Sequence, residues 1–442
     1  MNLTPTQRRW AWNALWLALA VFLVLRATSR REERGVILSH LEFGRRLLHG
    51  VDVYGPDPSE PANAPRPLHA PYPPSFGLLT APFAVLDDTL GTRPARAAWA
   101  LLQIGCLMAA ALSLRRLTLE RAPPGASTHY WNILWALMFA LGARFVLRDT
   151  HGGGGNVINL ALCLLAFTAA ERGHEGRAGL WLGISLATKP TQLWLLPVFW
   201  LLGRRRTVGA TILTGLGCVL LSLLLQRFDF GPWYRWIEGS WRIGTQTDAF
   251  AVPALDFPAF EWMNQCLRCA VARWFGTVPP EFAARVAWGV MPGLGLSQDA
   301  VTWITRVLSL GGLALVLGTA WRTRRVPEAR LWVFASALVL SVLLSPLSWK
   351  AHHMALLPAL FLLVQRAGAQ SGTARTRCVW LLVAWAVFCL PGKELIGNNG
   401  DEWQNSLYVI TIWDAVLVVL CTRSARAAAR EHEEPAARHS IR

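Results

Sequence analysis

Charged residues are scarce in this chain. They make up 16% of its 442 residues, whereas hydrophobic residues make up 53%. A water-soluble domain carries about a quarter charged residues, so a single soluble domain is excluded. Motifs for several enzyme classes are also absent: there is no Walker loop, and neither His174-Glu175 nor His432-Glu433 has the second His of a zincin helix. We expect no metal site and no cofactor.

Cysteine offers no functional pattern either. Most of the eight cysteines lie inside apolar runs, where they act as small packing residues. Cys266 and Cys269 fall in a segment expected outside the membrane, and their CLRC spacing would suit a redox pair or half of a metal site. Because the sequence has no second half, we expect neither function.

Long apolar runs are what the chain does contain. Several approach the roughly 20 residues needed to cross a bilayer, and the shorter ones would be tilted, broken or shielded by neighbours. The pattern predicts an all-α, polytopic helical integral membrane protein with about 10–13 transmembrane helices. The runs are Trp10–Leu25, Ala97–Leu114, Trp131–Val146, Val157–Ala170, Val208–Leu225, Val301–Trp321, Leu331–Leu347, Met354–Val364, Cys378–Leu390 and Ser406–Cys421.

The basic residues indicate how the chain is oriented. They cluster in the short connectors between apolar runs, which the positive-inside rule assigns to the cytoplasm together with both termini. This clustering argues against nucleic acid as the partner, despite a net charge of +16. Segments of about 26–96, 226–300 and 392–405 are then outer loops of one transmembrane domain, residues 1–421, and residues 422–442 form a cytoplasmic tail. A bacterial plasma membrane is the expected location, and the first run stays as an anchor because it lacks a small-residue cleavage site.

The first outer loop begins with a helical pattern. Apolar residues between Val36 and Leu48 recur at helical spacing opposite a charged face, which predicts an amphipathic helix in the headgroup plane. The stretch from Pro56 to Pro82 is too rich in proline to form one helix. Within it begins the apolar segment Pro71–Leu86, which predicts a tilted or re-entrant half-helix.

Three further breaks interrupt apolar stretches. RDTHGGGGN (Arg148–Asn156) holds four glycines, which let a ligand approach the backbone closely. ATKPT (Ala187–Thr191) divides the run Ala178–Leu202 into two short helices joined at Lys189. LSPLSWKAHH (Leu344–His353) combines hydroxyl, aromatic and basic groups.

We expect these breaks, together with the loop around Tyr72, to converge in one outward-facing ligand site. Their cations match a phosphate or diphosphate, and their aromatic rings suit a sugar face or an isoprenoid. A first-loop carboxylate would serve as a base towards a hydroxyl acceptor. The alternative interpretation of LSPLSWKAHH is a snorkelling lysine with interfacial polar residues between two ordinary spans. The cations are Lys189, Lys350, His352 and His353, and the aromatic residues are Tyr72, Trp349 and Trp262.

Several segments resemble, in this order, the motif series of glycosyltransferase family 87, over about Gly35 to Leu420. The resemblance implies a polytopic enzyme of the GT-C class. It further implies inverting transfer of a hexose, mannose in particular, from a polyprenyl-phosphate-sugar donor to a lipid or glycan hydroxyl at the outer membrane face. The segments are PYPPSFGLLTAPFAVL, GNVINLALCLLAFTAAERG, AGLWLGISLATKPTQLWLLPVFWLLGRRR, NQCLRCAVARWF, LSPLSWKAHHMALLPAL and NSLYVITIWDAVLVV.

The resemblance also implies site residues, because Lys189, His352, His353 and Asn156 fall on matching motif positions. The basic residues would stabilise the leaving phosphate. We assign the donor phosphate to Lys189, Lys350, His352 and His353, and substrate contacts to Tyr72, Asn156, Trp349 and Asn264.

Two positions depart from the family pattern. Val36 stands where the family usually has an Asp, and Gly155 stands where it often has a Gln. The usual base is therefore absent, and the candidates to replace it are, in order of preference, Glu33, Glu42 and Asp52. Each of the three is equally compatible with a solvated loop charge.

Other functions remain open. The Val36 departure would suit a catalytically inactive paralogue. A transporter or flippase of a lipid-linked sugar would instead place ionisable groups near mid-membrane in two symmetric halves, and no internal repeat is visible. A scaffold would have no need for polar groups at helix breaks, and transfer from a diphosphate carrier is disfavoured by the compact first loop.

Overall fold

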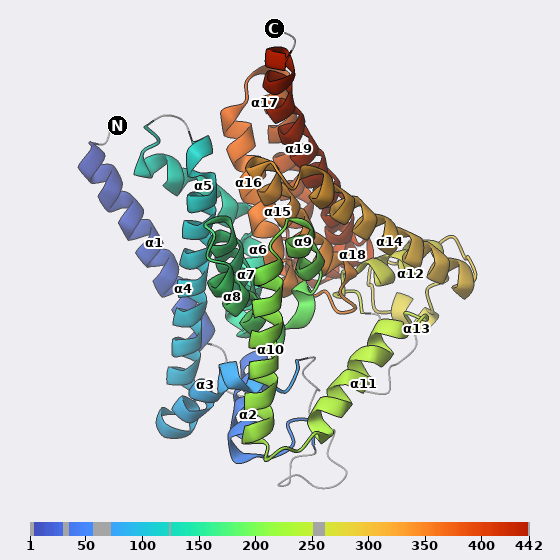
Figure 1. Ribbon diagram of the computed structural model, residues 1–442. Helices are drawn as coiled ribbons and strands as arrows, with labels where there is room; N and C mark the ends of the chain where they lie inside the picture. Colours follow the sequence, from blue (N-terminus) through green and yellow to red (C-terminus); the bar gives the residue numbers. More distant parts are fainter. Residues whose placement is uncertain (1–3, 30–34, 56–71, 123–124, 251–260, 441–442) are drawn as a thin grey trace. The chain divides into compact units, whose positions relative to one another are not determined.

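The computed structural model describes residues 4–29, 35–55, 72–122, 125–250 and 261–440. Within these ranges the chain is helical and contains no β-strand (Figure 1), which confirms the predicted all-α class. The chain forms two compact units. The first unit comprises Met1–Pro190 and Gly209–Ser240, and the second comprises Thr191–Val208 and Trp241–Arg442.

Among the described residues, five helices are long and apolar enough to cross a membrane. Two bent helix pairs bring this number to seven if each pair counts as one broken span. The five are α1 (Pro5–Thr28), α4 (Thr92–Thr118), α10 (Arg205–Leu225), α14 (Gln298–Thr323) and α15 (Pro327–Leu344). The bent pairs are α5 (Thr128–Leu141) with α6 (Ala143–Gly152), at 72°, and α17 (Gly372–Cys389) with α18 (Lys393–Ser406), at 80°.

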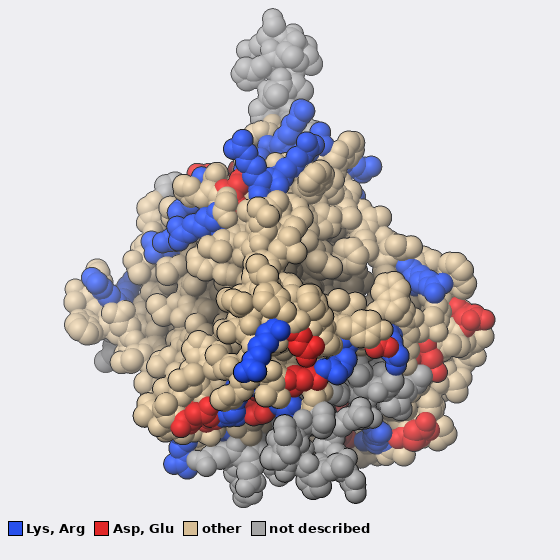
Figure 2. All heavy atoms as spheres, turned by 60° about the horizontal axis from the view of Figure 1, so that its bottom comes forward, with Lys and Arg blue, Asp and Glu red and all other residues tan. Residues whose placement is uncertain are grey.

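The chain is therefore a polytopic helical membrane protein. Figure 2 supports this, because uncharged residues cover most of the face that it shows. The predicted number of 10–13 transmembrane helices stays a prediction, because several apolar runs form helices shorter than the roughly 20 residues that an unbroken crossing needs. An example is α7 (Asn156–Glu171), which is apolar but has 16 residues.

The remaining helices are shorter or less apolar, apart from the long C-terminal helix. Short 3₁₀ turns cover Leu119–Arg121, Pro190–Gln192 and Lys350–Leu356. The other α-helices are α2 (Val36–His49), α3 (Phe76–Leu90), α8 (Glu175–Thr188), α9 (Leu195–Leu201), α11 (Gly231–Thr245), α12 (Leu267–Phe275), α13 (Pro280–Ala283), α16 (Leu357–Ala369) and α19 (Val409–Ser440).

The amphipathic helix expected after residue 35 is present as α2, and its apolar face packs against α3 within the first unit. Gly44 permits this close approach, because a Cβ there would lie 2.7 Å from the α3 backbone at Ala81. Gly77 does the same from α3, where a Cβ would lie 2.7 Å from the Leu47 side chain. The contact fixes α2 beside the segment that carries Tyr72.

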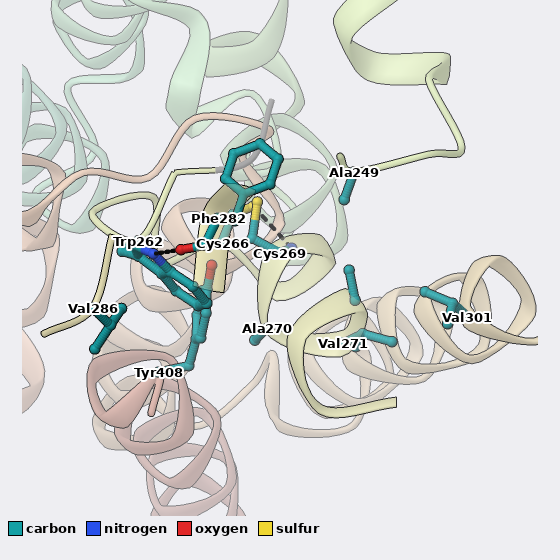
Figure 3. Close-up of a cluster of buried hydrophobic side chains, with 11 residues drawn as sticks. Ala249, Trp262, Cys266, Cys269, Ala270, Val271, Phe282, Val286, Val301 and Tyr408 are labelled. Atoms are coloured by element: carbon teal, nitrogen blue, oxygen red, sulfur yellow. Dashed lines mark hydrogen bonds between the residues drawn. The ribbon is translucent and has the colours of Figure 1, made fainter. Parts of the chain in front are cut away.

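A separate hydrophobic cluster organises the segment around α12 in the second unit. Trp262, Cys266 and Tyr408 belong to it (Figure 3), and each is at most 4% exposed. The Trp262 indole donates a hydrogen bond to the Phe282 carbonyl at 3.1 Å. Cys266 Sγ accepts the backbone N–H of Cys269 at 3.4 Å and so caps the start of α12. These contacts give Trp262 and the CLRC sequence a packing role.

Candidate functional site

The glycine-rich turn between α6 and α7 owes its composition to close packing. Gly153 has a φ of 72°, and a Cβ there would meet the side chain of Ile37 in α2 at 2.5 Å. A Cβ on Gly154 would collide with the carboxylate of Asp149. Larger residues at these two positions would displace α2 or Asp149, so the glycines serve the packing of the turn.

Asp149, near the end of α6, lies at the centre of this turn and is fully buried. Its Oδ1 accepts a hydrogen bond from Asn156 Nδ2 at 2.6 Å, and its Oδ2 accepts the backbone N–H of Val157 at 3.0 Å. Gly155, the residue that precedes α7, has no side chain that could cap the helix, so Asp149 satisfies the first N–H groups of α7 instead.

Asn156 binds Lys189 as well as Asp149. The Lys189 ammonium donates a hydrogen bond to Asn156 Oδ1, and its backbone carbonyl accepts one from Asn159 Nδ2 at 3.2 Å. Lys189 follows α8 in an extended conformation and is 6% exposed. Asp149, Asn156 and Lys189 therefore form one buried chain of an acid, an amide and a cation.

Aromatic rings form a wall beside these three hydrogen-bonded residues. The Lys189 ammonium lies 5.2 Å from the centroid of the Tyr72 ring, a cation–π distance. Tyr72 is stacked on Phe76 at 4.1 Å, and His40 of α2 meets both rings edge-on. The hydroxyl of Tyr54 donates to the backbone carbonyl of Tyr72, which ties the segment after α2 to the same wall.

Burial sets the charges in this cluster. It lowers the pKa of Lys189 to about 8, against the attraction of the Asp149 carboxylate, so the lysine is cationic at neutral pH. Burial and the nearby Lys189 lower the pKa of His40 to about 3, which keeps the imidazole neutral. Burial and Asp149 raise the pKa of Tyr72, which keeps the phenol protonated. The cluster thus presents a single protonated amine beside neutral rings.

The predicted base candidates in the first outer segment have different surroundings. Glu42 pairs with Arg45 at 2.7 Å and with Arg46 at 2.8 Å. Asp52 pairs with Arg235, and its Oδ1 accepts the backbone N–H of Tyr54 at 3.0 Å. Glu33 lies outside the described residues.

The Leu344–His353 segment lies in the second unit and is held at several points. Asn264 brackets it: its Nδ2 donates to the Pro346 carbonyl at 3.0 Å, and its Oδ1 accepts the Ser348 N–H at 2.8 Å. Lys350 pairs with both carboxylate oxygens of Asp401, at 2.6 and 2.8 Å. Asn264 therefore holds the backbone of the segment in place, and the Asp401 carboxylate neutralises the charge of Lys350.

The two adjacent histidines have different partners. His353 is fully buried between Asp414, which lies 3.1 Å from its Nδ1, and the Ser348 hydroxyl, 3.3 Å from its Nε2. His352 is half-buried, and its Nδ1 accepts the backbone N–H of Trp349 at 2.8 Å. A neutral ring that accepts at Nδ1 carries its proton on Nε2, so His352 is set up as a hydrogen-bond donor through Nε2.

The structure thus brings the predicted residues together in two groups, one in each unit. Tyr72, Asn156 and Lys189 form the first, which we call the Lys189 cluster together with the residues that hold them, Asp149 and His40. Trp349, Lys350, His352, His353 and Asn264 form the second. Among the described residues, no three His, Cys, Asp or Glu side chains are grouped to hold a metal ion.

Sequence reasoning missed four residues that complete these groups: Asp149, His40, Asp401 and Asp414. Asp149 stands inside the glycine-rich segment that the sequence marked, and Asp414 stands inside an apolar run, where a carboxylate is unusual. Both positions therefore carried a detectable sign. In the sequence, His40 stands within the predicted amphipathic helix and Asp401 stands among polar residues, so neither position gave such a sign.

An apolar cavity lies in the first unit and shares helix α6 with the Lys189 cluster. Its volume is about 520 Å³, within the range of roughly 300–1,000 Å³ that small-molecule sites occupy. Helices α1, α4, α5 and α6 line it with residues such as Leu19, Leu107, Phe139 and Val146. Helix α6 carries Val146 of the cavity and, three residues later, Asp149 of the cluster.

The family model described as glycosyltransferase family 87 matches residues 70–346, more than half of the chain. The match includes Tyr72, Asn156, Lys189 and Asn264 and ends before Trp349, so it is shorter than the range of motif similarity seen in the sequence. No curated protein matches the chain. The chain belongs to glycosyltransferase family 87.

Proposed function

We propose that the protein transfers a hexose, mannose in the first instance, from a polyprenyl-phosphate donor to a hydroxyl of a lipid or glycan acceptor. The transfer would take place at the outer face of the plasma membrane and would invert the anomeric centre. Membership of a glycosyltransferase family supports the reaction class. The observation that supports the donor class is the Lys189 cluster, a buried cation held by Asn156, which shares helix α6 with an apolar cavity.

The phosphate is the part of the donor that a buried cation would serve. Breaking the bond between sugar and phosphate builds negative charge on the leaving phosphate. A cation already fixed at that position stabilises the transition state more than the ground state. Lys189 is positioned by Asn156 and Asn159, so little reorganisation is needed when the charge develops.

The lipid part of the donor would suit the cavity lined by α1, α4, α5 and α6. Its walls are hydrocarbon side chains, and α6 carries both a cavity residue, Val146, and the cluster residue Asp149. A molecule with a phosphate head and a long apolar tail has this combination of chemistries. A nucleotide-diphosphate sugar has no apolar tail for the cavity.

The acceptor hydroxyl needs a base, and we propose that a carboxylate of the first outer segment supplies it. Of the two described candidates, Asp52 is linked to the Lys189 cluster through Tyr54, whose N–H it accepts and whose hydroxyl bonds to the Tyr72 carbonyl. Glu42 is held by two guanidinium groups of its own helix. Glu33 remains a candidate alongside them.

The proposal can be tested with purified protein in lipid nanodiscs. We expect transfer of radiolabel from polyprenyl-phosphate-mannose to a lipid acceptor extract, and none from a nucleotide-diphosphate-mannose. Asp52→Asn, Glu42→Gln and Glu33→Gln identify the base, since the variant of the base loses transfer while the others retain it. Glu120→Gln, which alters an exposed carboxylate in the Leu119–Arg121 turn, is the matched control.

Transfer from the nucleotide sugar instead would overturn the donor assignment. Binding of the lipid donor without transfer in the wild type would favour the inactive or transporting alternatives that the Val36 departure raises. Retention of transfer in all three carboxylate variants would exclude the proposed base.

A further inference from the structure

Helix α11 exposes a stripe of large apolar side chains that no other described segment covers. Phe230 is 63% exposed, Tyr234 69%, Ile237 57% and Trp241 71%. Phe230 directly precedes the helix, and the four residues recur at i, i+4, i+7 and i+11, which places them along one face. We call this face the α11 stripe.

The stripe is not the face by which α11 packs on the protein. That face lies on the opposite side of the helix and includes Pro232 and Gly239, which are buried. Next to it, Trp233 meets Trp236 edge-on at 5.7 Å, and the Trp233 indole donates to the Ser222 hydroxyl of α10 at 3.2 Å. The helix therefore has its packing contacts already, and the stripe points away from them.

The position of α11 in the chain places it next to the membrane. The candidate span α10 ends at Leu225, and α11 begins at Gly231 after a sharp corner. Arg227 and Phe228 form this corner with φ values of 52° and 61°, and Asp229 caps the new helix by accepting the Gly231 N–H at 2.8 Å. The connector between the two helices, residues 226–230, spans about 20 Å at most even when fully extended, so the start of α11 stays close to the bilayer.

The remaining face of α11 is charged. Arg235 and Arg242 are exposed there, and Glu238 lies between them. A helix with aromatic and aliphatic residues on one face and basic residues on another is typical of segments that lie in the membrane interface. Tyrosine and tryptophan are the residues that favour the headgroup level.

We propose that α11 is an interfacial helix that inserts the α11 stripe into the boundary between lipid headgroups and acyl chains of the outer leaflet. The partner is a phospholipid surface. An apolar stripe of this kind exposed to water would invite association, whereas contact with lipid buries it. Arg235 extends from the same helix to Asp52, so the interfacial helix also anchors the first outer segment at the membrane surface.

Photo-crosslinking in nanodiscs tests the proposal. The protein is prepared with p-benzoylphenylalanine in place of Tyr234 or Ile237, one copy per disc, in a phosphatidylcholine and phosphatidylglycerol mixture. We expect phospholipid adducts at both positions after irradiation, detected by mass spectrometry. Arg242→p-benzoylphenylalanine is the matched control, because Arg242 is exposed on the same helix but on its charged face, and it should give no lipid adduct.

Equal lipid adduct yields at 234, 237 and 242 would contradict an oriented helix, and absence of lipid adducts at 234 and 237 would exclude insertion. The same variants in proteoliposomes test the competing occupant. Adducts between two copies of the chain in place of lipid adducts would make the stripe a protein interface and overturn the proposal. Thermal unfolding of each variant, compared with that of the wild type, confirms that the helix is probed in folded protein.

Discussion

Replacing Lys189 with methionine is expected to reduce the turnover of glycosyl transfer by about 10²- to 10³-fold, the loss seen when one preorganised donor to a developing oxyanion is removed. Methionine keeps most of the side-chain volume, so the wall of Tyr72 and Phe76 stays filled while the charge disappears. The measurement is the turnover number with polyprenyl-phosphate-mannose in nanodiscs.

Two comparisons separate this effect from a general loss of structure. Lys189→Arg keeps a cation at the position and should retain more activity than Lys189→Met. Lys393→Met changes an exposed lysine at the start of α18 and should leave turnover unchanged. A Lys189→Met protein that melts like the wild type and still turns over at the wild-type rate would remove the lysine from the reaction.

Replacing Asp149 with asparagine is expected to move the alkaline limit of activity to lower pH. Lys189 is protonated below its pKa of about 8, so transfer should be retained below that pH and lost as pH rises through it. Asp149 opposes the lowering of this pKa by burial. His40 and Tyr72, which also face Lys189, are neutral and cannot take over this role. Without the carboxylate, Lys189 loses its proton at lower pH, and a pH–rate profile of both proteins records the shift.

Asp149→Ala should add a large loss of stability. It removes the cap of α7 and leaves a buried cation without its opposing charge, which costs about 3 kcal/mol in the free energy of unfolding. Asp229→Asn is the control, because Asp229 also caps a helix but lies at the exposed start of α11. An unchanged pH profile in Asp149→Asn would show that Asp149 has a purely structural role.

Local features of the fold could be predicted from the sequence. The helical pattern after residue 35, the divided run around Lys189 and the glycine-rich break before Asn156 all correspond to observed elements. Each rests on a periodicity, a proline or a glycine, whose effects act over a few residues. The same locality leaves the number of spans a prediction, since hydropathy alone does not distinguish a crossing from a buried short helix.

The partners of the functional residues could not be predicted in this way. Lys350 pairs with Asp401, 51 residues away, and Asn156 bonds to Lys189, 33 residues away, through contacts that depend on tertiary packing. Helix α2 gives a second example. Its apolar face packs on α3, and a stripe that faces protein has the same period as one that faces lipid. For α11, the exposure of the α11 stripe in the structure favours contact with lipid, a distinction that the sequence alone does not make.

The most direct test of the account is an experimental structure of the protein in nanodiscs with polyprenyl phosphate, the product left after sugar transfer. We expect the phosphate to lie within hydrogen-bonding distance of the Lys189 ammonium, with the first isoprene units leading towards the cavity lined by α6. A phosphate bound elsewhere, with Lys189 still bonded only to Asn156, would contradict it.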